Sequence, residues 1–213
     1  GGSTLWISRD NGLTWNDPKG RIAGLHQAVV QLNDGRLFSL SRGTTGHGNM
    51  PLSISSDMGK SWEYSDGPFQ PVSWGQRPVL LRLDEGPIFF ASFCKDMMIT
   101  NAAGKQHSVT GLFAAVSVDE GKTWPYKRLI TDESGLVIET MNGRKMTIDA
   151  HNAEFIGYLS VCQTPDKIIH LIGSRQHYAF NLKWLTTTPP PAPAEIRVKH
   201  EIETFSGPKF DLE

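Results

Sequence analysis

Polar and hydrophobic residues alternate in short runs along most of this sequence, and an alternation with a period of two predicts β-strands. The clearest runs cover residues 26–32 and 36–42, which flank the turn signal Asn33-Asp34-Gly35. Glycine in such a turn adopts the positive φ that joins two antiparallel strands, so we expect a hairpin. Two more hairpins are predicted by the paired runs 77–83 with 88–93 and 158–163 with 168–174.

A second pattern, Ser-x-Asp-x-Gly-x-(Ser/Thr)-Trp, occurs at residues 8–15, 55–62 and 117–124, and each copy is called an octet below. The aspartate is expected to accept hydrogen bonds from backbone N–H groups, and the glycine to close the turn with a positive φ. The tryptophan is expected to bury its ring while its N–H finds a partner. Three copies with the same fixed positions indicate a repeat architecture.

Octets and hairpins combine into one repeating unit. The octets begin at residues 8, 55 and 117, so successive starts are 47 and 62 residues apart. Each unit is expected to hold four strands, with the octet between the third and the fourth, which is typical of β-propeller blades. We assign the longer interval to a loop at 94–110. The other expected strands are residues 4–8, 51–55, 111–117, 126–130 and 178–185; no helix of ordinary length is predicted, and 133–152 give no clear signal.

The units suggest a domain division. Residues 1–185 are predicted to form a partial, all-β propeller with three to four blades. Residues 186–194, rich in proline and threonine, are predicted to be a linker, and residues 195–213 a tail or the start of a further domain. Because a propeller needs about four or more blades to close, we expect the missing blades to come from the parent chain or a second chain.

The composition limits the classes of binding partner that we expect. The 213 residues carry a net charge of −1 with a pI near 6.7, which does not favour nucleic acid or an anionic membrane. No apolar run approaches the roughly 20 residues of a membrane span. Cys94 and Cys162 are expected to be free thiols, although a disulfide between them stays open. The scattered histidines do not have zinc-site spacing, so no metal and no cofactor are predicted.

The octets resemble the Asp box, or BNR repeat, of the sialidase superfamily. The resemblance covers roughly residues 3–185 and corresponds to the C-terminal portion of a six-bladed propeller. It implies a glycoside hydrolase-like protein that acts on or binds an acidic or polar glycan, in a secreted or periplasmic location. It favours an exo-acting, sialidase-like enzyme for the full-length parent, with this segment inactive alone. The alternative is a non-catalytic propeller that binds carbohydrate or protein.

The first hairpin has the longest run of similarity to the sialidase superfamily. The run from His26 to Leu37 is similar to the sialidase blade that bears the second arginine of a carboxylate-binding triad. Arg42 lies eight residues after Asp34, where the family places that arginine. An arginine fork binds a carboxylate at two points, so this residue implies an acidic sugar. His26 departs from the family, because it stands where a glutamate activates the nucleophile.

The late hairpin supplies the candidate nucleophile. Tyr158 lies eight residues before Asp166, in a run that is similar to the one beginning with the family's nucleophilic tyrosine. A neutral phenol avoids repulsion from the substrate carboxylate, but a neighbouring base must take its proton. That base is His26, Glu154 or neither, and the residues leave this choice open.

The remaining candidates lie in loops predicted at the end of the strands opposite the octet turns, where a rigid scaffold concentrates binding groups. Near the expected place of the third triad arginine the sequence has Lys105 and His107 instead. The resemblance places the first arginine and the acidic aspartate on earlier blades. The residues predicted to bind substrate are Arg42, Arg77, Arg175, His177, Lys105, His107 and Trp74.

Overall fold

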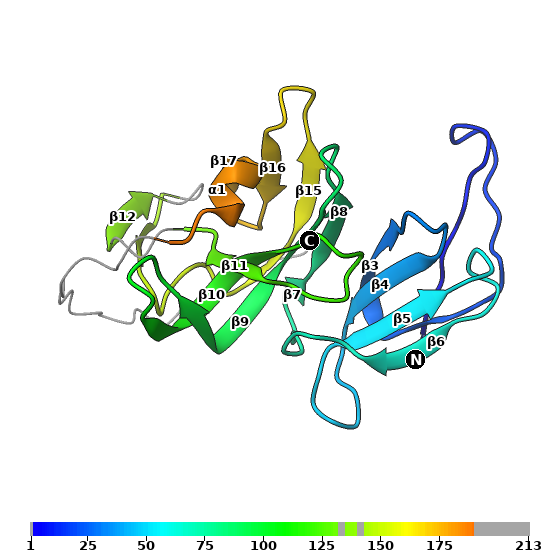
Figure 1. Ribbon diagram of the computed structural model, residues 1–213, viewed down its shortest axis with the longest axis horizontal. Coiled ribbons are helices and arrows are strands. Elements are labelled where there is room, and N and C mark those ends of the chain that lie inside the picture. Colours follow the sequence, from blue (N-terminus) through cyan, green and yellow to red (C-terminus); the bar gives the residue numbers. More distant parts are fainter. Residues whose placement is uncertain (1, 132–134, 140–142, 190–213) are drawn as a thin grey trace, which may run out of the picture.

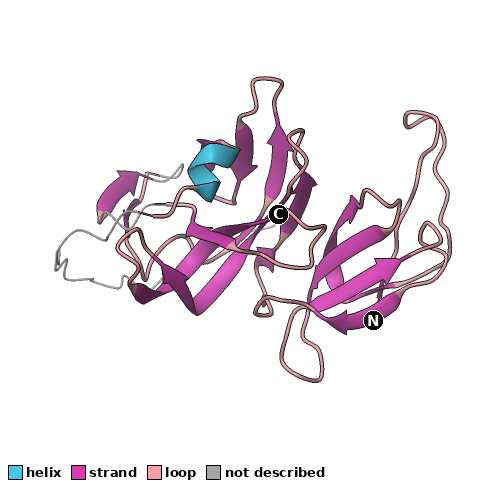
Figure 2. Ribbon diagram, viewed as in Figure 1, coloured by secondary structure: helices cyan, strands magenta, loops and turns pink. Residues whose placement is uncertain are grey.

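The computed structural model describes residues 2–131, 135–139 and 143–189, and the fold is almost entirely β-structure (Figures 1 and 2). The first sheet is an antiparallel meander in chain order, and the octet at 55–62 joins its last two strands. Its strands are β3 (Leu25–Gln31), β4 (Leu37–Arg42), β5 (Pro51–Ser55) and β6 (Glu63–Asp66). The alternation of residues therefore predicted this hairpin and the strand that follows it.

The second sheet repeats this meander, with the octet at 117–124 between its last two strands. Its strands are β8 (Val79–Arg82), β9 (Ile88–Thr100), β10 (Gln106–Ser117) and β11 (Tyr126–Leu129). The predicted loop at 94–110 is wrong, because β9 and β10 continue as one long hairpin to the pair Thr100–Gln106. The exposed charged residues Lys95 and Asp96 interrupt the apolar run of the sequence, so no strand was predicted there. In the structure, Ile99 and Val109 are buried on the apolar side of the extended hairpin.

The third sheet has three strands in the described residues, β15 (Ser160–Gln163), β16 (Ile169–Ile172) and β17 (His177–Phe180). A short helix, α1 (Leu182–Thr186), follows where a continued strand was predicted, so that prediction is wrong beyond Phe180. Asn181 causes the change, because its side chain accepts a hydrogen bond from the Trp184 N–H at 2.9 Å and caps the helix. Thr186, the first residue of the expected linker, still belongs to α1.

Three short strand pairs complete the described fold. β1 (Gly2–Ser3) pairs with β2 (Ile22–Ala23), and β12 (Leu136–Glu139) with β13 (Lys145–Ile148). The second pair shows two antiparallel strands in the described part of the segment 133–152, which has no clear sequence signal. β7 (Gln76–Arg77) runs parallel to β14 (Gly157–Tyr158), far away in sequence. The expected strand at 4–8 is wrong, since only the bridge Ile7–Asn16 forms there.

The first strands of the three sheets are neighbours: β3 contacts β8, and β8 contacts β15. A shared core fills the space between the sheets, and the described strands form no closed barrel. Phe69 stacks on Phe90 with ring centroids 4.4 Å apart, and Phe113 and Trp124 pack edge-on or tilted against this pair. Burying these rings supplies much of the apolar stabilisation of the second sheet.

Each octet forms the same local turn. In the third octet, the Ser117 hydroxyl donates to Asp119 at 2.8 Å, and Thr123 donates to Asp119 from its backbone N–H at 2.8 Å and its hydroxyl at 2.6 Å. The first and second octets repeat these bonds. The aspartate and glycine therefore act as their sequence pattern predicted.

The tryptophans only partly follow expectation. Trp62 and Trp124 are buried, as predicted, but their N–H groups have no hydrogen-bond partner among the described residues, because their surroundings are apolar. Trp15 is 57% exposed, and its N–H donates to the Gly12 carbonyl at 3.1 Å. The expectation of a buried ring with a satisfied N–H is therefore wrong for all three octets.

Hairpin turns and an octet turn meet at one end of the molecule. Glu120, in the third octet, accepts two bonds from the Arg82 guanidinium at 2.7 and 2.8 Å and also binds Asn33 in the first hairpin turn. The Lys167 ammonium lies 2.7 Å from the Asp84 carboxylate, joining the turns of the second and third sheets. We call this the turn end.

The structure also bears on the predictions for the cysteines, for membrane spans and for the C-terminal residues. Both cysteines are free thiols: Cys94 is buried, Cys162 is exposed, and the open possibility of a disulfide is wrong. No helix in the described part of the chain has the length and apolar character needed to cross a membrane. Most of the predicted linker and the whole predicted tail, residues 190–213, lie outside the described residues.

Candidate functional site

His26 and Arg42 lie on adjacent strands, at the end of the first hairpin away from its turn. Leu25 pairs with Arg42, and the ladder shifts register between Leu25 and Ala28. His26 occupies this bulge with a φ of 49°, a conformation that redirects its side chain out of the regular alternation. The hairpin register and the bulge together bring the His26 ring and the Arg42 guanidinium to the same strand end.

Arg77 and Tyr158 are placed opposite each other by the parallel pair of β7 and β14. The Arg77 guanidinium donates to the Leu159 carbonyl from Nη2 at 2.7 Å and from Nε at 3.3 Å, which fixes its position. Its Cζ lies 6.0 Å from the centroid of the Tyr158 ring. Gly75 and Gly157 allow the two segments to approach, since the Gly157 N–H donates to the Gly75 carbonyl at 2.8 Å.

These two pairs converge. The His26 and Tyr158 ring centroids are 5.2 Å apart with the planes tilted by 38°, although the two residues are 132 positions apart in the sequence. Burial, followed by the charges of Arg42 and Arg77, lowers the pKa of His26 below its ordinary 6.5. We call His26, Arg42, Arg77 and Tyr158 the arginine–tyrosine cluster. It brings residues of the first hairpin, β7 and β14 to the end of the sheets opposite the turn end.

The cluster carries positive charge without a matching carboxylate in the described contacts. Arg42 Nη1 is buried and has no hydrogen-bond partner among the residues that the structure describes. Because the lowered pKa keeps His26 neutral at neutral pH, the two guanidinium groups dominate the local potential. A buried guanidinium nitrogen without a hydrogen-bond partner is costly, so this arrangement favours binding an anion.

Glu154 is close to Tyr158 in the chain but is not a free base. Its side chain is 1% exposed, and the Tyr178 hydroxyl donates to Glu154 Oε2 at 2.8 Å. Burial raises the pKa of Glu154, outweighing the opposing effects of the Tyr178 hydroxyl and the neighbouring Arg175. Its φ of 30° is also unusual for a residue with a side chain. Glu154 therefore supports the segment that carries Tyr158.

Trp74 and Arg175 are close in the chain to the segments that carry these groups. Trp74 belongs to the loop that leads into β7, and 90% of its surface is exposed. Arg175 is partly buried and acts electrostatically on Glu154. The hydroxyl of Ser174, its chain neighbour, accepts a hydrogen bond from the Tyr158 N–H at 3.2 Å. The turn that contains Arg175 thus flanks the strand of Tyr158.

Three predicted residues are engaged elsewhere. Lys105 lies in the turn at the tip of the β9–β10 hairpin, where its backbone bonds to Asn101. His107 pairs with Ile99 in the same extension. His177 stacks on His170, with 3.0 Å between Nδ1 of His170 and Nε2 of His177. The structure gives none of these three a contact with the arginine–tyrosine cluster.

Sequence reasoning missed two features near the cluster. Tyr178 holds Glu154, but a tyrosine in an alternating strand carries no signal for that pairing. An open hollow beside Arg42 is lined in part by Tyr64 and Asp66. Its loop was recognisable only as glycine-rich sequence. In the part of the chain that the structure describes, no three histidine, cysteine or acidic residues group as metal ligands.

Comparisons with known proteins point in the same direction as the sequence pattern. No protein-family model matches the chain. A sialidase from Micromonospora viridifaciens is 25% identical over 188 residues, which are 84% of this chain, and the chain spans a quarter of that protein's length. This similarity supports a distant, sialidase-like relationship and a carbohydrate-related protein.

Solved structures give a fold comparison. A protein of unknown function from Dyadobacter fermentans matches with a TM-score of 0.50 and 15% identity, over 84% of this chain and 44% of that one. A mannose phosphorylase from Leishmania mexicana, solved with a phosphate ion, matches with a TM-score of 0.45 and 13% identity, over 85% of this chain and 58% of that one. The first match supports the all-β architecture; the second is too weak to argue from.

Proposed function

We propose that the chain is part of a sialidase-like β-propeller that binds an acidic sugar at the arginine–tyrosine cluster and, in the complete protein, hydrolyses its glycosidic bond. The observation that carries this proposal is the meeting of His26 and Arg42 from the first hairpin with Arg77 from β7 and Tyr158 from β14. The contacts of β3 with β8 and of β8 with β15 support blades arranged around a common axis.

The two arginines are proposed to hold the carboxylate of the sugar. Arg42 offers a buried Nη1 that lacks a partner among the described residues, and Arg77 is held in position by the Leu159 carbonyl. A guanidinium fork matches a carboxylate in geometry and charge, and one that is already fixed loses little freedom on binding. Acidic sugars would therefore bind more tightly than neutral sugars of the same size.

Tyr158 is proposed to be the nucleophile. Its oxygen would form a bond to the anomeric carbon as the bond from that carbon to the leaving oxygen breaks. The phenolic proton would pass to His26, whose lowered pKa keeps the imidazole neutral and able to accept it. The leaving oxygen would take a proton from an acid on another blade, as the resemblance implies. Water would then attack the anomeric carbon as its bond to the Tyr158 oxygen breaks, His26 would return the proton to that oxygen, and the water would lose its second proton to the acid that had protonated the leaving group.

This proposal assigns supporting roles to the remaining candidates. Glu154 is proposed to hold the β14 segment through Tyr178 rather than to act as the base, because its carboxyl group is buried and its pKa is raised. Trp74, with 90% of its surface exposed, is proposed to cover the bound sugar. Lys105, His107 and His177 are left out of the site, since their described contacts lie elsewhere.

The proposed nucleophile is tested on the full-length protein with an aryl glycoside of an acidic sugar. Tyr158→Phe keeps the ring contacts with His26 and Arg77 but removes the oxygen, so kcat is expected to fall by at least about a hundredfold. His26→Gln is the companion variant and should lower kcat and change the acidic side of the pH profile. Unchanged turnover in Tyr158→Phe would refute the nucleophile role.

A non-catalytic, glycan-binding propeller is the second candidate. The specific observation in its favour is the departure at His26, where the sialidase resemblance predicts a glutamate. Burial of Glu154 against Tyr178 removes the nearest alternative carboxylate. Binding of the acidic sugar that depends on Arg42, with no release of the aryl group by the wild-type protein, would favour this function.

A further inference from the structure

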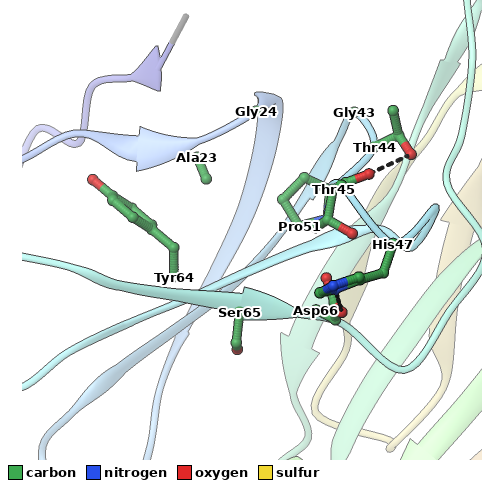
Figure 3. A pocket seen from close by; sticks show the side chains of 11 residues that line it. Ala23, Gly24, Gly43, Thr44, Thr45, His47, Pro51, Tyr64, Ser65 and Asp66 are labelled. Atoms are coloured by element: carbon green, nitrogen blue, oxygen red, sulfur yellow. Dashed lines mark hydrogen bonds and ion pairs between the residues drawn. The ribbon is translucent and has the colours of Figure 1, made fainter.

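An open hollow of about 620 Å³ lies on the outer part of the first sheet (Figure 3). This volume falls within the roughly 300–1,000 Å³ that is typical of small-molecule sites. Its walls come from the end of β2, the loop after β4 and the edge strand β6. Figure 3 shows Tyr64 on one side, His47 and Asp66 on the other, and Pro51 between them. The hollow is thus apolar on one side and polar on the other.

Tyr64 provides a fixed aromatic surface. Its ring is 59% exposed, and its hydroxyl donates to the Arg21 carbonyl at 2.5 Å. This bond ties β6 to the segment before β2 and limits rotation of the ring. Ala23 and Pro51 extend the apolar lining beside it. A fixed ring with an open face suits the C–H face of a pyranose, because little side-chain freedom is lost on contact.

The far end of β6 and the loop after β4 present hydrogen-bonding groups. Asp66 Oδ2 lies 2.5 Å from His47 Nδ1. Hydrogen bonds from Thr45 and then from His47 lower the pKa of Asp66, so that it is a carboxylate at neutral pH. A carboxylate held by two neighbours accepts hydrogen bonds from vicinal hydroxyl groups at its remaining lone pairs. Because Asp66 would repel a ligand carboxylate, this wall favours a neutral ligand.

The hollow adjoins the arginine–tyrosine cluster. The loop that contains Thr45 and His47 follows directly after Arg42. Gly24, on the facing wall, is so close to this strand that a Cβ there would lie 2.5 Å from the Arg42 carbonyl oxygen. Only Leu25 separates Gly24 from His26. The two sites are therefore formed by consecutive residues of the same two chain segments.

We infer that the hollow binds a neutral hexose, the unit of the glycan beyond the acidic sugar, with Tyr64 as the stacking surface and Asp66 as the hydroxyl acceptor. This inference rests on the proposed carbohydrate function, but it assigns a separate group of residues to the neutral part of the ligand. The protein would then recognise two successive sugar units of a glycan, one charged and one neutral. Specificity for the neutral unit would lie in the Gly43–His47 loop and β6.

The test measures binding of methyl glycosides of glucose, galactose, mannose and N-acetylglucosamine to the purified protein by saturation-transfer NMR and calorimetry. At least one is expected to bind with a millimolar Kd. Tyr64→Ala should raise that Kd at least about tenfold, and Asp66→Asn about three- to tenfold. Tyr64→Phe, the matched control, keeps the ring and should stay within about threefold of wild type. Because Tyr64 is largely exposed, these variants are expected to fold.

The outcomes separate this inference from the proposed function. Arg77→Ala should weaken binding of a free acidic monosaccharide and leave binding of the neutral glycoside unchanged, whereas Tyr64→Ala should do the reverse. If no neutral glycoside binds, or if Tyr64→Ala binds it as wild type does, the inference is overturned whatever happens at Arg77. If neutral binding depends on Tyr64 but acidic sugars do not bind, the hollow stands and the acidic-sugar proposal fails.

Discussion

The two ends of the sheets differ in how their charges are satisfied. At the turn end, Arg82 is paired with Glu120 and Lys167 with Asp84, so that opposite charges hold neighbouring sheets together. At the other end, Arg42 has a buried Nη1 without a described partner, and Arg77 is bonded to a carbonyl oxygen. The comparison shows that charge at the turn end is paired within the fold, whereas the described contacts of Arg42 and Arg77 include no carboxylate, as the proposed ligand site requires.

The largest effect is expected where the turn end joins the core. Trp124 is 6% exposed and packs against Phe38, Phe69 and Phe90, so Trp124→Ala should lower the free energy of unfolding by about 3–5 kcal/mol. Trp15→Ala is the matched control: it removes the same residue from the same octet pattern at an exposed position and should cost about 1 kcal/mol or less. Denaturant unfolding measures both. Equal losses would mean that the octets stabilise only through their local turns.

Removing one charge from each end tests the comparison directly. Arg82→Met deletes the two bonds to Glu120 and should reduce the free energy of unfolding by about 1–2 kcal/mol. Arg42→Met deletes a guanidinium with an unpartnered nitrogen and should change it by no more than about 0.5 kcal/mol. Thermal and denaturant unfolding measure both variants. A loss of stability in Arg42→Met equal to that in Arg82→Met would contradict the distinction between the two ends.

Lowering the pH should destabilise the octet turns. Hydrogen bonds from the hydroxyl and backbone N–H of the residue four positions later lower the pKa of Asp57 and Asp119 from 3.8 to about 2. A lowered folded-state pKa gives stability that is present above the unfolded value and is lost as the pH falls toward the folded one. The double variant Asp57→Asn/Asp119→Asn should therefore lose less of its melting temperature than wild type between about pH 4 and about pH 2. Parallel losses would exclude these carboxylates as the acid-sensitive groups.

Glu154, at the cluster end, should show the opposite sign. Because burial raises its pKa, its contribution to stability is fully present below its unfolded value of 4.5 and is lost as the pH rises through the folded value. Glu154→Gln can still accept the Tyr178 hydrogen bond without a charge. The variant should gain stability relative to wild type as the pH rises above about 4.5, a small effect visible in the difference between the two melting curves. A constant difference across pH would contradict a raised pKa.

The sequence predicted those parts of the fold that short-range chemistry determines. Asn33-Asp34-Gly35 and the octet residues form the expected turns because their hydrogen bonds close within a few positions. The long β9–β10 hairpin was missed because its pairing is decided by burial of Ile99 and Val109 against other segments. Helix α1 was missed because one cap, Asn181, outweighed the alternating pattern of the residues that follow.

The candidate site shows the same limit. The resemblance to the sialidase superfamily selected Arg42 and Tyr158 by their spacing from Asp34 and Asp166, and the structure places both near His26. No local pattern could show that Tyr178 binds Glu154, or that His47 binds Asp66 beside a hollow, because these pairings depend on how separate segments meet. Lys105 and His107 were selected by position in an expected loop; in the structure Lys105 lies in the turn of the β9–β10 hairpin and His107 lies in β10.

The most direct test of the account is calorimetric titration of the protein with N-acetylneuraminic acid, compared between wild type and Arg42→Met at low and moderate salt. We predict binding to the wild type that weakens with salt, and at least about a tenfold higher Kd for Arg42→Met, because the carboxylate loses a charge-assisted partner. Affinity for the acidic sugar that is the same in both proteins, with unfolding curves that also coincide, would contradict the assignment of Arg42 to a ligand carboxylate.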